Sequence, residues 1–311
     1  MIFISSLELT TVNYLEFRDL GEAIETIAHE QLQYRQLDRG SIIIRLGSHE
    51  SCDLSILQAS VSKRVDGQGF VAPGRIFFEV CLGGDEPHLY SSQEFRSGQV
   101  YAASGGGGGH QLLKPGYLAY CVSFDEELLQ KQAGCPVVFP SEGVVRDICP
   151  RRFADLVGLC REFTTERPEG RAAHELSDRL ASLLLGEFLR ESIPISLPSG
   201  SGSRAKLAWK IRELLECYEL PLADVCAEVE MSERAMRRVF TDAYGVSPIQ
   251  YRLSLRLSRV REELKHSPAR KGVVAAVATR HGFWHMGRFG SQYRRQYLES
   301  PTETLRRHGA R

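Results

Sequence analysis

The chain has 311 residues, of which 42% are hydrophobic and 25% are charged. This composition is typical of a globular protein and excludes a disordered or fibrous chain. The 39 Lys and Arg residues balance the 39 Asp and Glu residues, but residues 1–202 carry 18 basic and 27 acidic residues, a net charge of −9. Residues 203–311 carry a net charge of +9, which indicates an anionic partner for the C-terminal part.

The N-terminal part begins with a predicted helix near residues 20–29, followed by short runs rich in β-branched and aromatic residues. These runs lie at residues 41–46, 54–61, 75–82 and 117–124. Gly, Pro and Asp clusters separate them at spacings that favour a β-barrel or β-sandwich over residues 31–124. Residues 105–109 are five consecutive glycines without the Lys-Ser/Thr of a phosphate loop, so we expect a flexible turn there.

Two helices are predicted at about residues 151–191, after the strands. Apolar residues recur there at helical spacing, first from Phe153 to Phe163 and again from Leu176 to Phe188. Such stripes fit packing against the strands and a dimerisation surface equally well. Residues 194–203 are rich in Pro, Gly and Ser and are predicted to be a linker between domains at 1–193 and 204–311.

The pattern after the linker is helical throughout. Seven helices are predicted, at residues 205–218, 222–229, 232–244, 248–265, 273–281, 285–297 and 301–307. Within them residues 225–240 are repeated at residues 277–293, with one extra residue in the second turn. Each copy is followed by a Ser-Pro pair, at Ser247-Pro248 and Ser300-Pro301. A short helix, a tight turn and a second helix with aromatic anchors predict two helix-turn-helix units, whose second helices enter the DNA major groove.

Helical periodicity separates inward from outward residues in each second helix. The inward residues are Met236, Val239, Phe240 and Tyr244 in the first copy, and Phe283, Phe289 and Tyr293 in the second. Arg234, Arg237 and Arg238 then face the groove, where Arg can bind guanine or phosphate. The predicted groove-facing residues of the second copy are His285, Met286, Gly287, Ser291 and Arg294, with Arg288 and Arg295 on phosphates.

The predicted connecting helix, residues 248–265, has a length that suits DNA. Its 18 residues give roughly 27 Å at 1.5 Å per residue, close to the ~34 Å between successive major grooves on one face of B-DNA. A single chain could therefore place both second helices in adjacent grooves and read two half-sites.

Three motifs resemble a known family. They are Met231-Ser232-x-x-x-Met236-x-x-Val239-Phe240, Gly245-x-Ser247-Pro248 and Gly282-Phe283-x-x-x-x-x-Phe289. Residues 205–307 thereby resemble the DNA-binding domain of AraC/XylS-type transcriptional regulators. Residues 282–289 and 299–305 are similar to a subset that regulates catabolic operons, including the ethanolamine-utilisation regulators. Leu298-Glu299 departs from the Phe-Gly that is usual in the family, so the resemblance does not predict the exact conformation of the turn there.

The resemblance implies a cupin-like effector-binding β-barrel in the N-terminal half, dimerisation, and activation of transcription through RNA polymerase. We accordingly expect a soluble, cytoplasmic, homodimeric regulator that binds double-stranded DNA and a small molecule. The N-terminus lacks a basic leader, no apolar run is long enough to cross a membrane, and the eight cysteines lack metal-site spacing.

A cupin-type metal enzyme is the alternative for the N-terminal half. Metal sites in such barrels need clustered His and carboxylate ligands, whereas His29, His49, His88 and His110 are isolated in the sequence. We therefore expect no catalytic residue, no metal and no cofactor.

One strand suggests an effector contact. Alternation along residues 75–82 places Phe77, Glu79 and Cys81 on one face and Ile76, Phe78 and Val80 on the other. A carboxylate in an apolar strand is costly unless it is paired. Glu79, beside Phe77, is therefore a candidate to bind a cationic effector such as an amine, and the alternatives are a surface position or a pair with an arginine such as Arg45.

Overall fold

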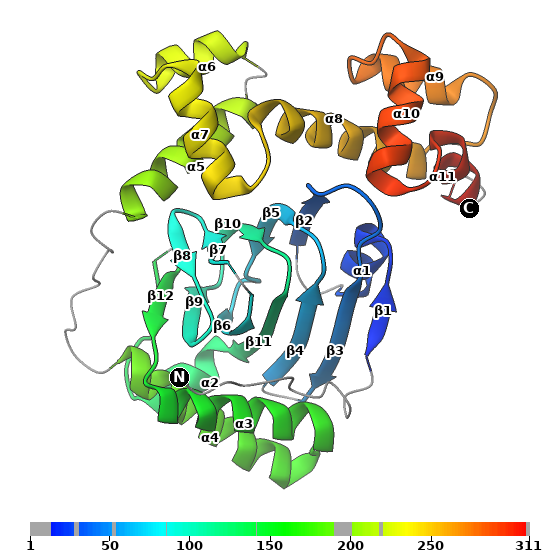
Figure 1. Ribbon diagram of the computed structural model, residues 1–311. Helices are drawn as coiled ribbons and strands as arrows, with labels where there is room; N and C mark the ends of the chain where they lie inside the picture. Colours follow the sequence, from blue (N-terminus) through cyan, green and yellow to red (C-terminus); the bar gives the residue numbers. More distant parts are fainter. Residues whose placement is uncertain are drawn as a thin grey trace.

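The N-terminal domain consists of two β-sheets packed face to face, with helices on the outside (Figure 1). The computed structural model describes residues 14–27, 31–51, 54–84, 86–140, 142–189, 201–217 and 220–308. The seven-stranded sheet has the order β1 (Leu15–Phe17), β3 (Ile44–Glu50), β4 (Leu54–Val61), β11 (Tyr117–Asp125), β6 (Arg75–Gly83), β9 (Gln99–Ser104) and β12 (Val144–Asp147). The five-stranded sheet has the order β2 (Gln31–Gln36), β5 (Val65–Phe70), β10 (Gly108–Leu113), β7 (His88–Tyr90) and β8 (Gln93–Phe95).

The β-rich N-terminal fold is confirmed, with two differences from the expected elements. Strands β1 and β12 lie outside the expected span of residues 31–124. The glycine run is only partly a turn, because Gly108 and Gly109 begin β10. A Cβ atom on Gly108 would lie 2.3 Å from the Gly69 carbonyl oxygen, so glycine permits the close pairing of β10 with β5.

Both apolar stripes of the predicted helices pack inside this chain. Helices α3 (Pro150–Glu166) and α4 (Gly170–Phe188), together with α2 (Glu126–Ala133), cover the outer face of the seven-stranded sheet. Phe163 and Leu180 are fully buried in the same cluster as Phe78 of β6. The structure therefore assigns the stripes to packing against the sheet.

The C-terminal domain contains seven helices within the described residues. They are α5 (Ser201–Cys217), α6 (Leu222–Glu228), α7 (Glu233–Tyr244), α8 (Pro248–Lys265), α9 (Val273–Arg280), α10 (Met286–Tyr297) and α11 (Pro301–His308). Ser232 and Ser247 cap α7 and α8 through their side chains, and Pro248 occupies the first turn of α8. Helix α5 begins at Ser201, so residues 201–203 of the expected linker are helical; residues 194–200 lie outside the described residues.

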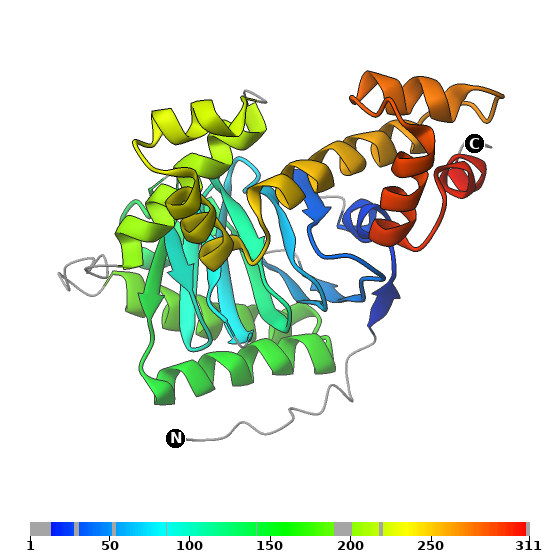
Figure 2. The same cartoon turned by 45° about the horizontal axis from the view of Figure 1, so that its top comes forward.

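The C-terminal domain lies on the outer face of the five-stranded sheet, so that this sheet separates it from the N-terminal interior. Helix α5 contacts β8, and α8 runs along β2 (Figures 1 and 2). Helix α1 (Leu20–Thr26) packs beside β2, near the C-terminal end of α8. Across the described ranges, every helix is too short or too polar to span a membrane.

Candidate DNA-binding and effector sites

The first helix-turn-helix unit is formed by α6 and α7. Met236, Phe240 and Tyr244 are buried, and the rings of Phe240 and Tyr244 stack with centroids 4.4 Å apart. The predicted inward stripe is therefore confirmed, except that Val239 is only partly buried. The opposite face of α7 is available for contact, because Arg234 and Arg238 are exposed and Arg237 is half-exposed.

Acidic side chains on α7 already pair with two of its arginines. Arg237 Nε donates to Glu233 Oε1 at 2.9 Å, and Arg238 Nε lies 3.8 Å from Asp242 Oδ2. These are exposed pairs one helical turn apart, which stabilise a helix by only a few tenths of a kcal/mol. A phosphate or a guanine can therefore replace the carboxylate at small cost.

The second unit is formed by α9 and α10 and presents a different surface. Phe283, Phe289 and Tyr293 are buried as predicted. All seven predicted contact residues are exposed, namely His285, Met286, Gly287, Arg288, Ser291, Arg294 and Arg295. Trp284, in the turn before α10, is 74% exposed. The exposed face of α10 therefore carries uncharged and apolar groups together with Arg288 near its start, and Arg294 and Arg295 near its end.

The turn after α10 shows how the chain tolerates Leu298-Glu299. Leu298 adopts the left-handed conformation at φ 59°, and its N–H donates to the Arg294 carbonyl. This conformation is unfavourable for a residue with a side chain, but the helix cap is retained. Glu299 is buried and accepts hydrogen bonds from Arg261 (2.8 Å) and Thr304 Oγ1 (2.7 Å). The departure therefore adds a carboxylate to the base of the second unit.

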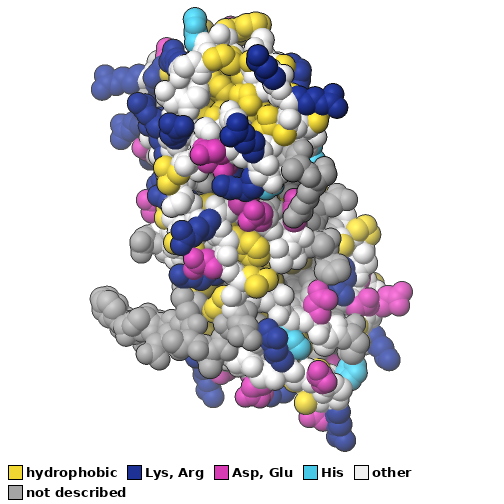
Figure 3. All heavy atoms as spheres, turned by 90° about the vertical axis from the view of Figure 1, so that its right-hand side faces the viewer, with side chains coloured by type: hydrophobic (Ala, Val, Ile, Leu, Met, Phe, Trp, Pro, Cys, Tyr) yellow, Lys and Arg dark blue, Asp and Glu magenta, His cyan; other side chains and the backbone are white. Residues whose placement is uncertain are grey.

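Basic side chains gather on the C-terminal domain. On the face shown in Figure 3, Lys and Arg cluster over the helices at the top, whereas acidic residues are more frequent below. This distribution agrees with the opposite net charges of the two parts of the sequence.

A cavity of about 510 Å³ lies between the two sheets of the N-terminal domain. Its walls are mostly apolar and come from α1 and from the inward faces of strands in both sheets. Phe77 and Glu79 both line it, and Ile76, Phe78 and Val80 point away into the core beneath α3 and α4. The predicted alternation of β6 is thus confirmed, and the structure places both candidate effector residues at a cavity of ligand size.

Glu79 is the buried carboxylate of this cavity, with 1% exposure. Its Oε1 accepts hydrogen bonds from the hydroxyls of Tyr117, at 2.6 Å, and Tyr90. Burial, together with the negative charge of Glu79, raises the pKa of both tyrosines well above the usual value, so that they remain donors. The alternative partner Arg45 instead pairs with Glu16 on the neighbouring strand β1, at 3.2 Å.

A second cavity, of about 500 Å³, lies between the domains and shares a wall with the first. Leu20 and Ile24 of α1 and Leu32 and Tyr34 of β2 line both cavities. This thin partition separates the N-terminal interior from charged residues of α8.

Asp19 anchors α1 to α8. Its Oδ1 accepts from Gly21 N–H at 2.8 Å, which caps α1, and from Lys265 Nζ at 3.0 Å. Its Oδ2 accepts from Arg261, which also binds Glu299. Burial disfavours the charge of Asp19, but Arg261 and Lys265 outweigh it and lower its pKa. Helix α1, which lines the cavity between the sheets, is thus tied to the second helix-turn-helix unit.

Asp66 forms the other interdomain centre, on the outer face of β5. It is fully buried and accepts hydrogen bonds from Tyr251 of α8 (2.9 Å), Arg35 and His110. Burial opposes its charge, but Arg35 and His110 hold the pKa of Asp66 well below its usual range. The ring of Trp209 from α5 packs on His110 at 5.0 Å. No local sequence pattern marks this cluster, because its members are far apart in the chain.

The histidines of the sheets bind protein groups. His49 lies 3.3 Å from the Pro168 carbonyl, His88 contacts Gly83 and Lys114, and His110 binds Asp66. His29 lies outside the described residues. Within the part of the chain that the structure describes, no group of three His, Cys, Asp or Glu side chains is placed to hold a metal ion.

Comparisons with known proteins identify the class of the C-terminal domain. Residues 225–307 match the family model of a helix-turn-helix domain. The chain is 29% identical over 181 residues to the probable thc operon regulatory protein of Rhodococcus erythropolis, covering 55% of this chain and 53% of that protein. It is 35% identical over 160 residues to XylDLEGF operon transcriptional activator 3 of Pseudomonas putida, covering 50% and 47%.

These matches confirm the resemblance: the C-terminal domain is a helix-turn-helix domain of the AraC/XylS type, and the relatives are transcriptional regulators. The chain spans about half the length of the curated relatives that it matches. Among solved structures, the AraC-like transcriptional activator CuxR covers 79% of this chain and 94% of its own, with a TM-score of 0.41 and 15% identity. ToxT from Vibrio cholerae O395 covers 90% and 98%, with a TM-score of 0.30 and 10% identity. TM-scores this low add nothing to the fold described above.

Proposed function

We propose that this protein is an effector-responsive, sequence-specific DNA-binding regulator that activates transcription of a catabolic operon. The observation that carries the proposal is the pair of helix-turn-helix units at the two ends of α8, each with an exposed, arginine-bearing second helix. Operon activators among the relatives support the direction of regulation. RNA polymerase as the partner, and a homodimer, are inferred from the family resemblance.

Both units would engage one face of the DNA. Helix α8 has 18 residues, hence roughly 27 Å, and this length suits successive major grooves about 34 Å apart. Arg234, Arg237 and Arg238 would contact guanines or phosphates in one groove. The exposed residues of α10 would read the next groove, with Arg288 and Arg295 on phosphates.

The test is footprinting of the full-length chain on genomic DNA fragments. The full chain is needed because Leu37, Leu89 and Leu112 of the N-terminal domain share an apolar cluster with Phe240 of the first unit. A fragment of residues 203–311 would lack these partners. We expect protected sites whose affinity falls steeply with salt as phosphate contacts are lost. Binding without sequence preference would contradict the proposal.

The effector would act through the partition formed by α1 and β2. We propose that a cationic effector, such as an amine, binds beside Glu79 and displaces Leu20 and Ile24. Because Asp19 caps α1, this displacement would change the hydrogen bonds from Arg261 and Lys265 to Asp19 and so reorient the second unit. Loss of effector affinity is the expected result for Glu79→Gln.

Asp19→Asn tests the coupling without an effector, because asparagine also caps helices but carries no charge. Amide hydrogen exchange in α8–α11 should rise several-fold, whereas exchange in α5–α7 should change little. Asp224→Asn, at an exposed acid in the first turn of α6, is the matched control. Unchanged exchange in α8–α11 would show that Asp19 does not anchor the second unit.

A further inference from the structure

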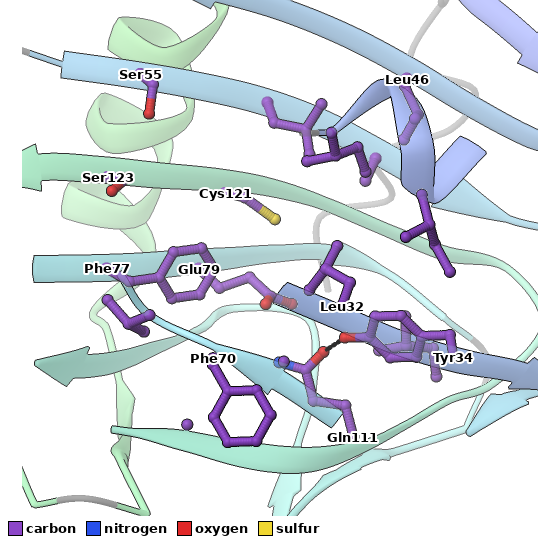
Figure 4. A pocket seen from close by; sticks show the side chains of 18 of the residues that line it. Leu32, Tyr34, Leu46, Ser55, Phe70, Phe77, Glu79, Gln111, Cys121 and Ser123 are labelled. Atoms are coloured by element: carbon purple, nitrogen blue, oxygen red, sulfur yellow. Dashed lines mark hydrogen bonds between the residues drawn. The ribbon is translucent and has the colours of Figure 1, made fainter. Parts of the chain in front are cut away.

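The inward face of β6 carries two opposite charges into the same cavity. Arg75, Phe77 and Glu79 alternate along this strand, and all three line the cavity. Phe77 is the inward residue between them in the order of the strand, and the rest of the cavity wall is mostly apolar. Figure 4 shows Ser55 and Ser123 at one end of this row and Glu79 farther along it.

The guanidinium of Arg75 is positioned by neutral groups. Its Nε donates to Ser123 Oγ at 3.1 Å, and its Nη2 donates to the Ser123 carbonyl at 2.6 Å and to Ser55 Oγ at 3.3 Å. Glu50, the cross-strand neighbour of Ser55, also lines this cavity. The hydrogen bonds to Ser123 and Ser55 fix the orientation of the guanidinium group. Its Nη1 can still donate to a carboxylate, the planar partner that arginine prefers.

The carboxylate of Glu79 is fixed in a similar way at the other position. The hydroxyls of Tyr90 and Tyr117 both donate to its Oε1, and its negative charge contributes to the raised pKa of each. These two donors fix the orientation of the Glu79 carboxylate at the cavity wall. A ligand ammonium at the wall would meet a carboxylate that is already oriented.

The separation of the two charges sets the kind of ligand. Ser123 pairs with Phe77 across the sheet, so the guanidinium lies level with Phe77, one residue pair from Glu79. Successive residues on one face of a strand are about 7 Å apart, and Glu79 leans farther away toward Tyr117. The two charges are therefore on the order of 10 Å apart, across the apolar surface of Phe77 and Leu57.

We propose that the effector is a zwitterion with separated ends: a carboxylate bound by Arg75, a short apolar spacer over Phe77, and an ammonium bound by Glu79. An ω-amino carboxylate has this chemistry. The inference rests on the proposed function in taking the cavity as the effector site, and it adds an anionic end to the amine inferred from Glu79 alone.

Calorimetric titration of the full-length chain, without DNA, tests this with three probes of equal chain length. ε-Aminocaproate has both charged ends, hexylamine only the ammonium and hexanoate only the carboxylate. Each charge-assisted contact should add about tenfold or more in affinity, so ε-aminocaproate should bind at least tenfold more tightly than either analogue. Equal or tighter binding of hexylamine or hexanoate, or no binding of any probe, would overturn the proposal.

Variants at two positions assign the ends of the ligand. Arg75→Gln should remove the preference for ε-aminocaproate over hexylamine, and Arg75→Lys should retain part of it. Glu79→Gln should remove the preference over hexanoate. A preference that survives Arg75→Gln in a folded protein, as judged by its circular dichroism and melting temperature, would contradict the assignment. Footprinting tests DNA binding on the unliganded chain and does not depend on these titrations. If none of the probes binds as expected, the DNA-binding proposal is unaffected, and loss of the DNA-binding proposal would not affect the ligand titrations.

Discussion

The two helix-turn-helix units are attached to the N-terminal domain by different kinds of contact. The first unit shares an apolar core with the five-stranded sheet, in which Phe240 lies in one cluster with Leu37 and Leu112. The second unit has a core of its own, built around Phe289. Its contacts to the N-terminal domain are polar, such as the bonds of Gln296 Nε2 to the Gln36 and Asp38 carbonyls at 3.0 and 3.1 Å.

This difference in attachment bears on which unit can move. Separating the first unit from the N-terminal domain would expose apolar surface, which costs about 25 cal/mol of free energy per Å². The second unit can exchange its ion pairs and hydrogen bonds for water, or for DNA, at lower net cost. The cavity proposed for the effector, moreover, adjoins this polar attachment through α1 and Asp19. We therefore propose that the first unit stays fixed on the N-terminal domain, and that the N-terminal domain controls the position of the second unit.

Matched truncations of the two cores should have the largest effect. Phe240→Ala and Phe289→Ala each remove a fully buried ring, which costs about 3–5 kcal/mol of unfolding free energy. Chemical denaturation measures the loss. Hydrogen exchange should show that Phe240→Ala also loosens β2 and β10, whereas Phe289→Ala affects only α8–α11. Equal loosening of the strands in both variants would remove the distinction between the units.

The next largest effect is expected from the arginines of the first unit. Arg238→Ala should cost about 1–3 kcal/mol of DNA-binding free energy and relax specificity at one base pair if Arg238 binds a guanine. Titration of a panel of operator variants measures both quantities. Arg179→Ala, at an exposed position on α4, is the control. A uniform loss across all sequences would assign Arg238 to a phosphate instead.

A phosphate contact in the second unit should give a smaller and sequence-independent loss. Arg295→Ala should weaken all sites alike and reduce the slope of log affinity against log salt by about one. Titrations at several salt concentrations test this. Sequence-selective loss would instead show that the second unit reads bases through Arg295.

The smallest effect concerns pH at the attachment of the first unit. Burial lowers the pKa of His110 despite its bond to Asp66, so the folded protein binds fewer protons there than the unfolded chain does. Stability from this group is present above the unfolded pKa of about 6.5 and is lost as the pH falls below it, at up to roughly 1.4 kcal/mol per pH unit. Denaturation from pH 7.5 to 5.5 should show a flatter profile for His110→Gln. An identical profile would indicate that His110 keeps its usual proton affinity.

Periodicity and capping residues predicted the helical domain well. The bounds of α8 were predicted to the residue, and α7, α9 and α10 were each predicted to within one residue. Among the strands, β4, β6 and β11 were found because they carry β-branched and aromatic runs. Strands β5 and β10 were missed because Gly67, Gly69, Gly108 and Gly109 give them little apolar character.

Site residues could be predicted from the sequence only where they lie on a single helix or strand. The outward arginines of α7 and the inward Glu79 follow from local periodicity. Arg75, at the start of the same strand, was not singled out, because its role depends on Ser55 and Ser123 of two other strands. Asp19 was also missed, because its partners lie more than 240 positions away in the chain and no local pattern connects them.

The spacing of half-sites tests the central proposal most directly, namely that one chain reads two adjacent grooves with two helix-turn-helix units. Footprinting should be combined with sedimentation to establish how many chains bind each site. We expect each chain to protect two half-sites about 10 base pairs apart, so that a homodimer protects two such pairs. Inserting about five base pairs between the two half-sites of one chain should abolish tight binding. Binding that is indifferent to the insertion, or that needs two chains for two half-sites, would contradict the proposal.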